Sequence, residues 1–220
     1  MTKNSPSITV RELYEAKARD MSLKLTGGVN GLTNQITSPR IQKLGLALAG
    51  YLEYIRSGRV LFIGRTEINY LSRLESSEIQ NTINRTFEAD LTCIVATAGL
   101  DLPPVLVEKA RENAVPILIT PAISSRAIDE IVQFLEHRLA PSTAVHGVMM
   151  EVFGMGVLLL GDSGLGKSEC GLELVLRGHR LISDDAVSIR RIGLERIVGS
   201  GPDLLPFHME LRGVGIINVR

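Results

Sequence analysis

Short apolar runs alternate with helix-like segments in the first part of the chain. Three runs read as strands: Val60–Ile63, Cys93–Ala96 and Ile117–Ile119. Continuous apolar strands of this length are typical of a sheet that is buried on both faces. The segments beside them have helical periodicity, and we expect helices over 68–87, 105–113 and 127–139. The pattern predicts an α/β domain with a mostly parallel sheet over residues 1–139.

The beginning of this domain carries two further local signals. Thr9 stands three residues before Glu12, which is the spacing of a capping box ahead of a helix. Residues 26–31 read Thr-Gly-Gly-Val-Asn-Gly, a composition that favours turns. We therefore expect a helix that begins after Thr9, followed by a turn before the first long strand.

Polar groups in the loops of this domain allow two interpretations. They could bind an anion, or they could be helix caps and solvated turns, which need fewer assumptions. The groups are Arg65, Thr66, Asp101, Ser124 and Ser125. No nucleophile stands beside a base among them, so we expect this domain to serve regulation or assembly.

The pattern changes after residues 140–143, Ala-Pro-Ser-Thr, which we interpret as a linker. A strand-like segment over 144–152 follows, and then the apolar run Val157–Leu160. A helical pattern ends at Gly178, and the sequence beyond it is rich in strand formers and glycines. We expect a second domain over 144–220.

A phosphate-binding loop lies directly after the run Val157–Leu160. Residues 161–168, Gly-Asp-Ser-Gly-Leu-Gly-Lys-Ser, match the Gly-x-x-x-x-Gly-Lys-Ser/Thr pattern between a strand and a helix. Its backbone N–H groups can cradle phosphate oxygens, while Lys167 reaches the terminal phosphates and Ser168 ligates Mg²⁺. The expected nucleotide-binding residues are Gly161, Asp162, Ser163, Gly164, Leu165, Gly166, Lys167 and Ser168.

Other groups near this loop have both a functional and a plain reading. Asp184 and Asp185 follow an apolar pair, where they could serve metal binding and proton transfer or form a polar turn. His146 precedes the loop and could equally be a packed or surface histidine. Glu210 and Arg212 flank one residue, so both could face one side of a strand as a surface pair.

Composition narrows the class of protein. Lys and Arg total 24 against 24 Asp and Glu, so no net charge attracts nucleic acid or an anionic membrane. The two cysteines, Cys93 and Cys170, belong to no metal-type cluster. No segment resembles a signal peptide or a membrane span. We expect a soluble cytoplasmic protein with no membrane or nucleic-acid partner.

The order of these motifs resembles the HPr kinase/phosphorylase family. The matching blocks are 146–148, 154–158, 161–169, 177–181, 184–185 and 210–219, with 39–50 in the first domain. The resemblance implies a truncated P-loop kinase domain, because family members continue past residue 220 with a basic loop, an arginine and further helices. The size of 144–220, small for a phosphate-loop domain, indicates the same.

The resemblance also implies an activity and a division of roles. Such enzymes use ATP to phosphorylate a serine of the carrier protein HPr, and they remove that phosphate by phosphorolysis, which releases pyrophosphate. Pyrophosphate is a possible alternative donor, and the family predicts a homohexamer. The implied roles are proton exchange for Asp184, charge stabilisation for His146 and Lys167, and Mg²⁺ ligation for Ser168 and Glu210. The alternative is a nucleotide-sensing module that binds ATP or GTP without transferring phosphate.

Overall fold

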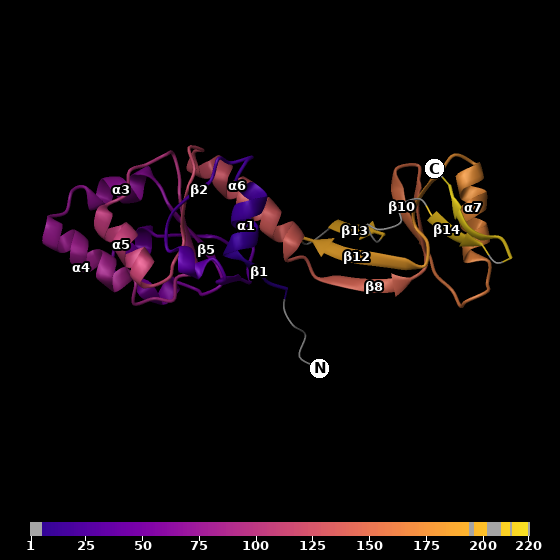
Figure 1. The fold of residues 1–220 in the computed structure, drawn as a ribbon, viewed down its shortest axis with the longest axis horizontal. Coiled ribbons are helices and arrows are strands. Elements are labelled where there is room, and N and C mark those ends of the chain that lie inside the picture. Colours follow the sequence, from indigo (N-terminus) through magenta and orange to yellow (C-terminus); the bar gives the residue numbers. More distant parts are fainter. Residues whose placement is uncertain (1–5, 194–195, 202–207, 212, 220) are drawn as a thin grey trace. The chain divides into compact units, whose positions relative to one another are not determined.

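The computed structural model describes residues 6–193, 196–201, 208–211 and 213–219. Arg212 lies outside the described residues. The chain divides into two compact units, Met1–Leu139 and Ala140–Arg220, here called unit 1 and unit 2 (Figure 1). Among the described helices, none combines the length and the apolar character that a membrane crossing requires.

Unit 1 is built on a five-stranded sheet in the order β2-β7-β6-β5-β4. The strands are β2 (Lys24–Gly27), β4 (Gln42–Lys43), β5 (Val60–Ile63), β6 (Cys93–Ala96) and β7 (Ile117–Ile119). The pairs β4–β5, β5–β6 and β6–β7 are parallel, and only β2 joins antiparallel at its edge. The prediction of a mostly parallel sheet is confirmed, as are the bounds of its three apolar strands.

Successive side chains of the central strands point to opposite faces of the sheet and lie in two separate hydrophobic cores. Phe62 and Val95 point into one core, which α1 (Val10–Lys17) and α6 (Ser124–Arg138) cover. Leu61 and Ile94 point into the other, and its covering helices are α2 (Gly45–Leu48), α3 (Arg65–Leu71), α4 (Ser76–Thr86) and α5 (Pro104–Glu112). The sheet is thus buried on both faces, as continuous apolar runs require.

The prediction of a single helix over 68–87 is wrong, because the structure has two helices there. α3 ends at Leu71, and α4 begins at Ser76. Glu75 has an extended backbone, and its N–H donates to the carboxylate of Glu78 at 2.9 Å. This cap starts a new helix, which periodicity alone did not reveal. The capping box of Thr9 and Glu12 at the start of α1 is confirmed.

The turn-rich stretch over 26–31 is more ordered than expected. It contains the end of β2 and a 3₁₀ helix, η1 (Val29–Gly31). A Cβ atom on Gly31 would collide with the carbonyl oxygen of Ala114, so the backbones of the two loops pack directly together. Short strands β1 (Ile8–Thr9) and β3 (Gln35–Ile36) pair with each other, and η2 (Leu52–Tyr54) follows α2.

In the part of unit 2 that the structure describes, three small antiparallel sheets occur with one helix, α7 (Lys167–Leu176), which contacts β9, β11 and β14. The first sheet has the order β10-β9-β11, with β9 (Val148–Val152), β10 (Met155–Leu159) and β11 (Arg180–Ser183). The second has the order β13-β12-β8, with β8 (Ser142–His146), β12 (Ala186–Ile192) and β13 (Arg196–Ser200). The third pairs β14 (His208–Leu211) with β15 (Gly215–Asn218).

The strand-like segment expected over 144–152 is two strands that belong to different sheets. β8 pairs with β12, and β9 pairs with β10 and β11. The break is at Gly147, whose N–H donates to the carbonyl of Asp185 at 3.0 Å. A Cβ atom on Gly147 would lie 2.6 Å from the carbonyl oxygen of Leu159, so only glycine fits at this crossing. Strand β8 also begins inside the stretch that we interpreted as a linker.

Helix α7 covers one face of the β10-β9-β11 sheet. Val148, Met150, Leu181 and Met209 form the buried centre of this core. Gly171 lets the helix approach closely, because a Cβ there would lie 2.9 Å from the Cε of Met209 and 3.0 Å from Val148. The core of unit 2 is therefore small, and it fixes α7, and with it the loop before α7, against the sheet.

Candidate active site

The topology of unit 2 brings its candidate residues together at one end of the strands in its first sheet. Strands β10 and β11 both run antiparallel to β9, so they run in the same direction. In the register, Leu159 lies opposite Val148, and Ser183 lies opposite Met149. The loop after β10, the residues after β11 and the residues before β9 therefore meet at this end. Residues 161–168, the aspartate pair and His146 stand on those three segments.

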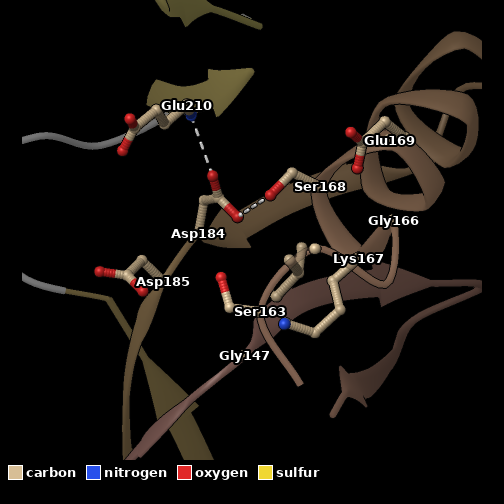
Figure 2. Close-up of a pocket in the computed structure, with 11 residues that line it drawn as sticks. Gly147, Ser163, Gly166, Lys167, Ser168, Glu169, Asp184, Asp185 and Glu210 are labelled. Carbon is tan, nitrogen blue, oxygen red and sulfur yellow. Dashed lines mark hydrogen bonds between the residues drawn. The ribbon is translucent and has the colours of Figure 1, made fainter. Parts of the chain in front are cut away.

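The loop over 161–168 forms the start of α7. Gly166 has a left-handed backbone with φ of 84°, and α7 begins at Lys167. The ammonium group of Lys167 donates to the carbonyls of Gly161 and Asp162, each at 2.9 Å. The lysine thus folds back over its own loop, where its charge lies close to the space that the loop encloses (Figure 2).

Asp184 is tied to the loop and to β14. Its Oδ1 accepts a hydrogen bond from the hydroxyl of Ser168 at 3.1 Å, and its Oδ2 accepts one from the backbone N–H of Glu210 at 2.9 Å (Figure 2). Asp184 is half-buried. Both oxygens of this carboxylate are engaged, so its position is set by two elements that are distant in sequence.

Asp185 has a different environment from its neighbour. Its side chain is 81% exposed, and its Oδ1 lies 3.3 Å from the Nδ1 of His146, which is 87% exposed. Asp185 has a left-handed backbone with φ of 74°, a conformation that costs a non-glycine residue free energy. This backbone turns the two aspartates of the pair in different directions, as Figure 2 shows.

These groups surround a cavity of about 280 Å³. The sequence-predicted residues Ser163, Gly164, Gly166, Lys167, Ser168, Asp184 and Glu210 line it. Gly161, Asp162, Leu165 and His146 do not line it, although His146 contacts the lining residue Asp185. Sequence reasoning did not assign Glu169, Gly147 or Val148 to the site, and it named Asp185 without a fixed role.

The charge in this cavity is strongly unbalanced. Of the described residues, Glu169, Asp184, Asp185 and Glu210 line it with four carboxylates, and Lys167 lines it with one ammonium group. A polyphosphate would meet net repulsion there unless divalent cations entered with it. Among the described residues, no three His, Cys, Asp or Glu side chains are arranged to hold a metal ion. Glu210 contacts Asp184 through its backbone N–H, and the hydroxyl of Ser168 forms a hydrogen bond with the carboxylate of Asp184.

Comparisons with known proteins agree with this arrangement of motifs. The family model for the HPr serine kinase N terminus matches residues 8–135, and the model for the HPr serine kinase C-terminal domain matches residues 137–220. The chain belongs to the HPr serine kinase family. The resemblance inferred from the motif order is confirmed, and it extends over both units.

Curated relatives of this family are similar along nearly the whole chain. HPr kinase/phosphorylase of Geobacter sulfurreducens is 42% identical over 99% of this chain and 68% of the relative. The protein of the same name from Leptospira biflexa is 42% identical over 98% of this chain and 66% of the relative. The protein of the same name from Bacillus cytotoxicus is 38% identical over 97% of this chain and 68% of the relative. The chain therefore spans about two thirds of the length of these relatives.

A solved structure, the Hpr(Ser) kinase/phosphatase from Coxiella burnetii, is similar over 35% of this chain and 51% of that chain. The sequences are 34% identical there, and the TM-score is 0.34. At that score the likeness does not bear on how the elements are arranged.

Proposed function

We propose that unit 2 phosphorylates a serine of the carrier protein HPr with ATP and reverses the reaction by phosphorolysis. The observation that carries the proposal is the contact between Ser168 and Asp184 at a loop that ends in Gly-Lys-Ser. A hydroxyl and a carboxylate so placed beside a phosphate loop are the parts that phosphoryl transfer requires. Membership in the HPr serine kinase family supports HPr as the acceptor.

The loop over 161–168 would hold the β- and γ-phosphates of the nucleotide. Its N–H groups and the N-terminus of α7 provide donors for phosphate oxygens. Lys167 now donates to two carbonyls of its own loop, and phosphate oxygens would replace these weaker acceptors. The lysine would then stabilise the charge that develops on the transferring group, as we expected from the sequence.

The donor set fits Mg²⁺, which prefers oxygen ligands and usually keeps several waters. Ser168 would ligate the ion, Asp184 would orient it, and Glu210 would contribute from β14, where its backbone N–H donates to Asp184. When bound, the ion would neutralise phosphate charge among the four carboxylates. A cavity with this excess of negative charge is unsuited to ATP alone.

We assign proton transfer to Asp185 in place of Asp184, the residue expected from the sequence. Asp184 already accepts hydrogen bonds on both oxygens, from Ser168 and from Glu210. Asp185 is largely exposed in the same cavity, so a seryl hydroxyl can reach it. His146 contacts Asp185 and would stabilise its charge. A carboxylate within hydrogen-bond reach of the hydroxyl lowers the barrier by accepting the proton as the new bond forms.

The reverse reaction uses the same groups. A phosphate oxygen attacks the phosphorus of the seryl phosphate, the bond between phosphorus and the serine oxygen breaks, and Asp185 returns a proton to that oxygen. The products are HPr and pyrophosphate. By microscopic reversibility pyrophosphate can also serve as a phosphoryl donor, as expected from the resemblance.

Assembly and location are further parts of the proposal. Several large apolar side chains of unit 2 are exposed, among them Phe153, Met155, Leu176 and Ile197. Exposed apolar groups of this size favour contacts between subunits, and we propose a homo-oligomer, hexameric as in the family expectation. ATP as the donor places the reaction in the cytoplasm.

Transfer of labelled phosphate tests the proposal. The chain is incubated with γ-labelled ATP, Mg²⁺ and HPr, with the Geobacter sulfurreducens relative as a positive control. We expect label on a serine of HPr, loss of transfer in Asp185→Asn with ATP binding retained, and weakened Mg²⁺-dependent ATP binding in Asp184→Asn. Full transfer by Asp185→Asn would return the proton-accepting role to Asp184.

The same assay separates the kinase from a nucleotide sensor. ATP binding by calorimetry, without label on HPr under conditions where the relative is active, would favour the sensor. Lys167→Ala should weaken ATP binding in either case, so it tests the loop independently of the transfer step. Circular dichroism of each variant confirms that it is folded.

A further inference from the structure

Unit 1 has a cavity of its own at the carboxyl edge of its parallel sheet. It has a volume of about 370 Å³ and lies at the ends of β5, β6 and β7. Arg65, Thr66 and Ser124, three of the loop groups singled out from the sequence, line it together with Lys43. Asp101 and Ser125 do not line it. The carboxyl edge of a parallel sheet is where α/β domains usually bind ligands.

The charges in this cavity favour an anion. Lys43 and Arg65 are exposed, and neither forms an ion pair with another described residue. The one lining carboxylate, Glu67, accepts the N–H of Gly64 at 2.9 Å through its Oε2. Two cations therefore face one carboxylate that is already engaged. This balance is opposite in sign to that of the cavity in unit 2.

The floor of the cavity is held in place by a hydrogen bond between hydroxyl groups. The Oγ of Ser124 lies 2.7 Å from the Oγ1 of Thr97, which is fully buried at the end of β6. Ser124 is the first residue of α6, and its N-cap residue Ile123 offers no side-chain acceptor to the first turn. The positive end of this 15-residue helix adds to the field of Lys43 and Arg65.

A second cavity adjoins the first and shares Lys43 and Glu67 with it. Its wall is the tyrosine shelf, which we define as Leu46, Tyr51, Tyr54 and Ile55. Tyr51 and Tyr54 are each 57% exposed. The shelf is anchored to β4, because Gln42 accepts the N–H of Arg56 at 2.9 Å and donates to the carbonyl of Tyr54. Exposed aromatic rings on a fixed loop are a surface for stacking a sugar or a base.

We propose that unit 1 binds a small organic phosphate monoester. The phosphate lies between Lys43 and Arg65 at the carboxyl edge, and the ring of the ligand lies on the tyrosine shelf. Both parts of the site are continuous through Lys43, so one ligand can occupy them together. Inorganic phosphate has no ring to place on the shelf and binds more weakly. All residues that line the two cavities belong to unit 1.

Tyrosine fluorescence provides a direct test, because it reports on unit 1 alone. The chain has no tryptophan, and its four tyrosines, at positions 14, 51, 54 and 70, all lie in unit 1. Ribose 5-phosphate is the probe, since it carries a phosphate and a ring and does not absorb at the excitation wavelength. We expect a saturable change in fluorescence, with inorganic phosphate binding about tenfold more weakly.

Matched variants locate the binding. Arg65→Ala should weaken ribose 5-phosphate binding about tenfold or more, since it removes a charge-assisted contact. Arg126→Ala is the control, because Arg126 is an exposed arginine in the first turn of α6 that lines a different cavity. Tyr51→Ala should weaken binding of ribose 5-phosphate and leave that of inorganic phosphate unchanged. Lys167→Ala should bind ribose 5-phosphate like the wild type.

Three results would overturn the proposal: no saturable change up to about 10 mM ribose 5-phosphate, equal losses in Arg65→Ala and Arg126→Ala, or loss of the signal in Lys167→Ala. Calorimetry with AMP in the Lys167→Ala background then identifies the source of the phosphate. Tighter binding than ribose 5-phosphate indicates a nucleotide, and equal affinity indicates a sugar phosphate. Thermal unfolding of each variant confirms that unit 1 remains folded.

Discussion

The sheets of the two units differ in how they are covered. Every residue of β5 and β6 in unit 1 is buried, because helices pack on both faces. No residue of β10 in unit 2 is fully buried, and α7 packs on one side of a small core. In unit 1, the packing of side chains on both faces fixes the position of the sheet. In unit 2, the arrangement of the strands depends more on backbone contacts, such as the hydrogen bond between Gly147 and Asp185.

The cavities of the two units also differ in charge. Unit 2 places four carboxylates around one lysine, while unit 1 places two cations beside one carboxylate. The first arrangement requires divalent cations before a polyphosphate can bind, and the second attracts an anion directly. The comparison teaches that the two phosphate sites that we propose depend on opposite charge balances. It can be tested through variants of each unit.

The largest effect is expected for Lys167→Ala in unit 2. This change removes the ammonium group that Lys167 contributes to the cavity, so phosphoryl transfer to HPr should fall by up to roughly a thousandfold. Initial rates with γ-labelled ATP measure the loss. Arg177→Ala is the control, because Arg177 forms its ion pair with Glu173 at the other end of α7 and should leave the rate unchanged. Equal losses in both variants would indicate damage to the helix.

Gly31→Ala tests the close packing of unit 1. The new Cβ would overlap the carbonyl oxygen of Ala114, so the loops must separate, and we expect the free energy of unfolding to fall by about 3 kcal/mol. Gly178→Ala in unit 2 has no atom within 4 Å of the new Cβ and should cost only about 1 kcal/mol, for its left-handed backbone. Denaturant unfolding measures both. A smaller loss in Gly31→Ala than in Gly178→Ala would contradict the account.

The two cysteines should differ in reactivity by about a hundredfold or more. Cys93 is buried in β6, and burial raises the pKa of its thiol from the ordinary 9.0 to about 12, whereas Cys170 on α7 is exposed. At pH 8 a thiol reagent should modify Cys170 rapidly and Cys93 only after denaturation. Because the folded pKa is raised, the contribution of Cys93 to stability is complete below pH 9 and is lost as the pH rises toward 12. Fast modification of both thiols would contradict this burial.

The smallest effect is expected at the start of α1. Thr9→Ala removes a side-chain acceptor from the capping box and should cost about 1 kcal/mol at pH 7. The pKa of Glu12 is lowered, chiefly by hydrogen bonds from the backbone and side chain of Thr9. Because the pKa of Glu12 is lowered on folding, its ionised carboxylate stabilises the fold above pH 4.5. This stabilisation is lost as the pH falls through the pKa of the folded state. The difference in melting temperature between variant and wild type should therefore shrink near pH 3.

The sequence predicted the strands that are buried on both faces and missed those at the edges. β5, β6 and β7 are continuous apolar runs, and their bounds agree with the prediction. β2 and β4 lie at the two edges of the sheet, and they contain polar residues such as Lys24 and Gln42. Edge strands are half solvated, so hydrophobicity does not reveal them.

The candidate site was predicted in composition and not in its contacts. A local pattern of glycines with a lysine pointed to residues 161–168, and five of them line the cavity. The contact between Ser168 and Asp184 depends on the register of three strands, which no local pattern encodes. The different surroundings of Asp184 and Asp185 arise from the left-handed backbone of Asp185, which became visible only in three dimensions.

Phosphorolysis tests the central claim, that one cavity in unit 2 transfers the phosphate in both directions. Serine-phosphorylated HPr is mixed with inorganic phosphate, Mg²⁺ and the protein, and pyrophosphate is measured. The account predicts one pyrophosphate for each HPr released, with Asp185→Asn losing this reaction and the forward transfer together. Release of HPr without pyrophosphate, or an Asp185→Asn variant that loses one direction only, would contradict it.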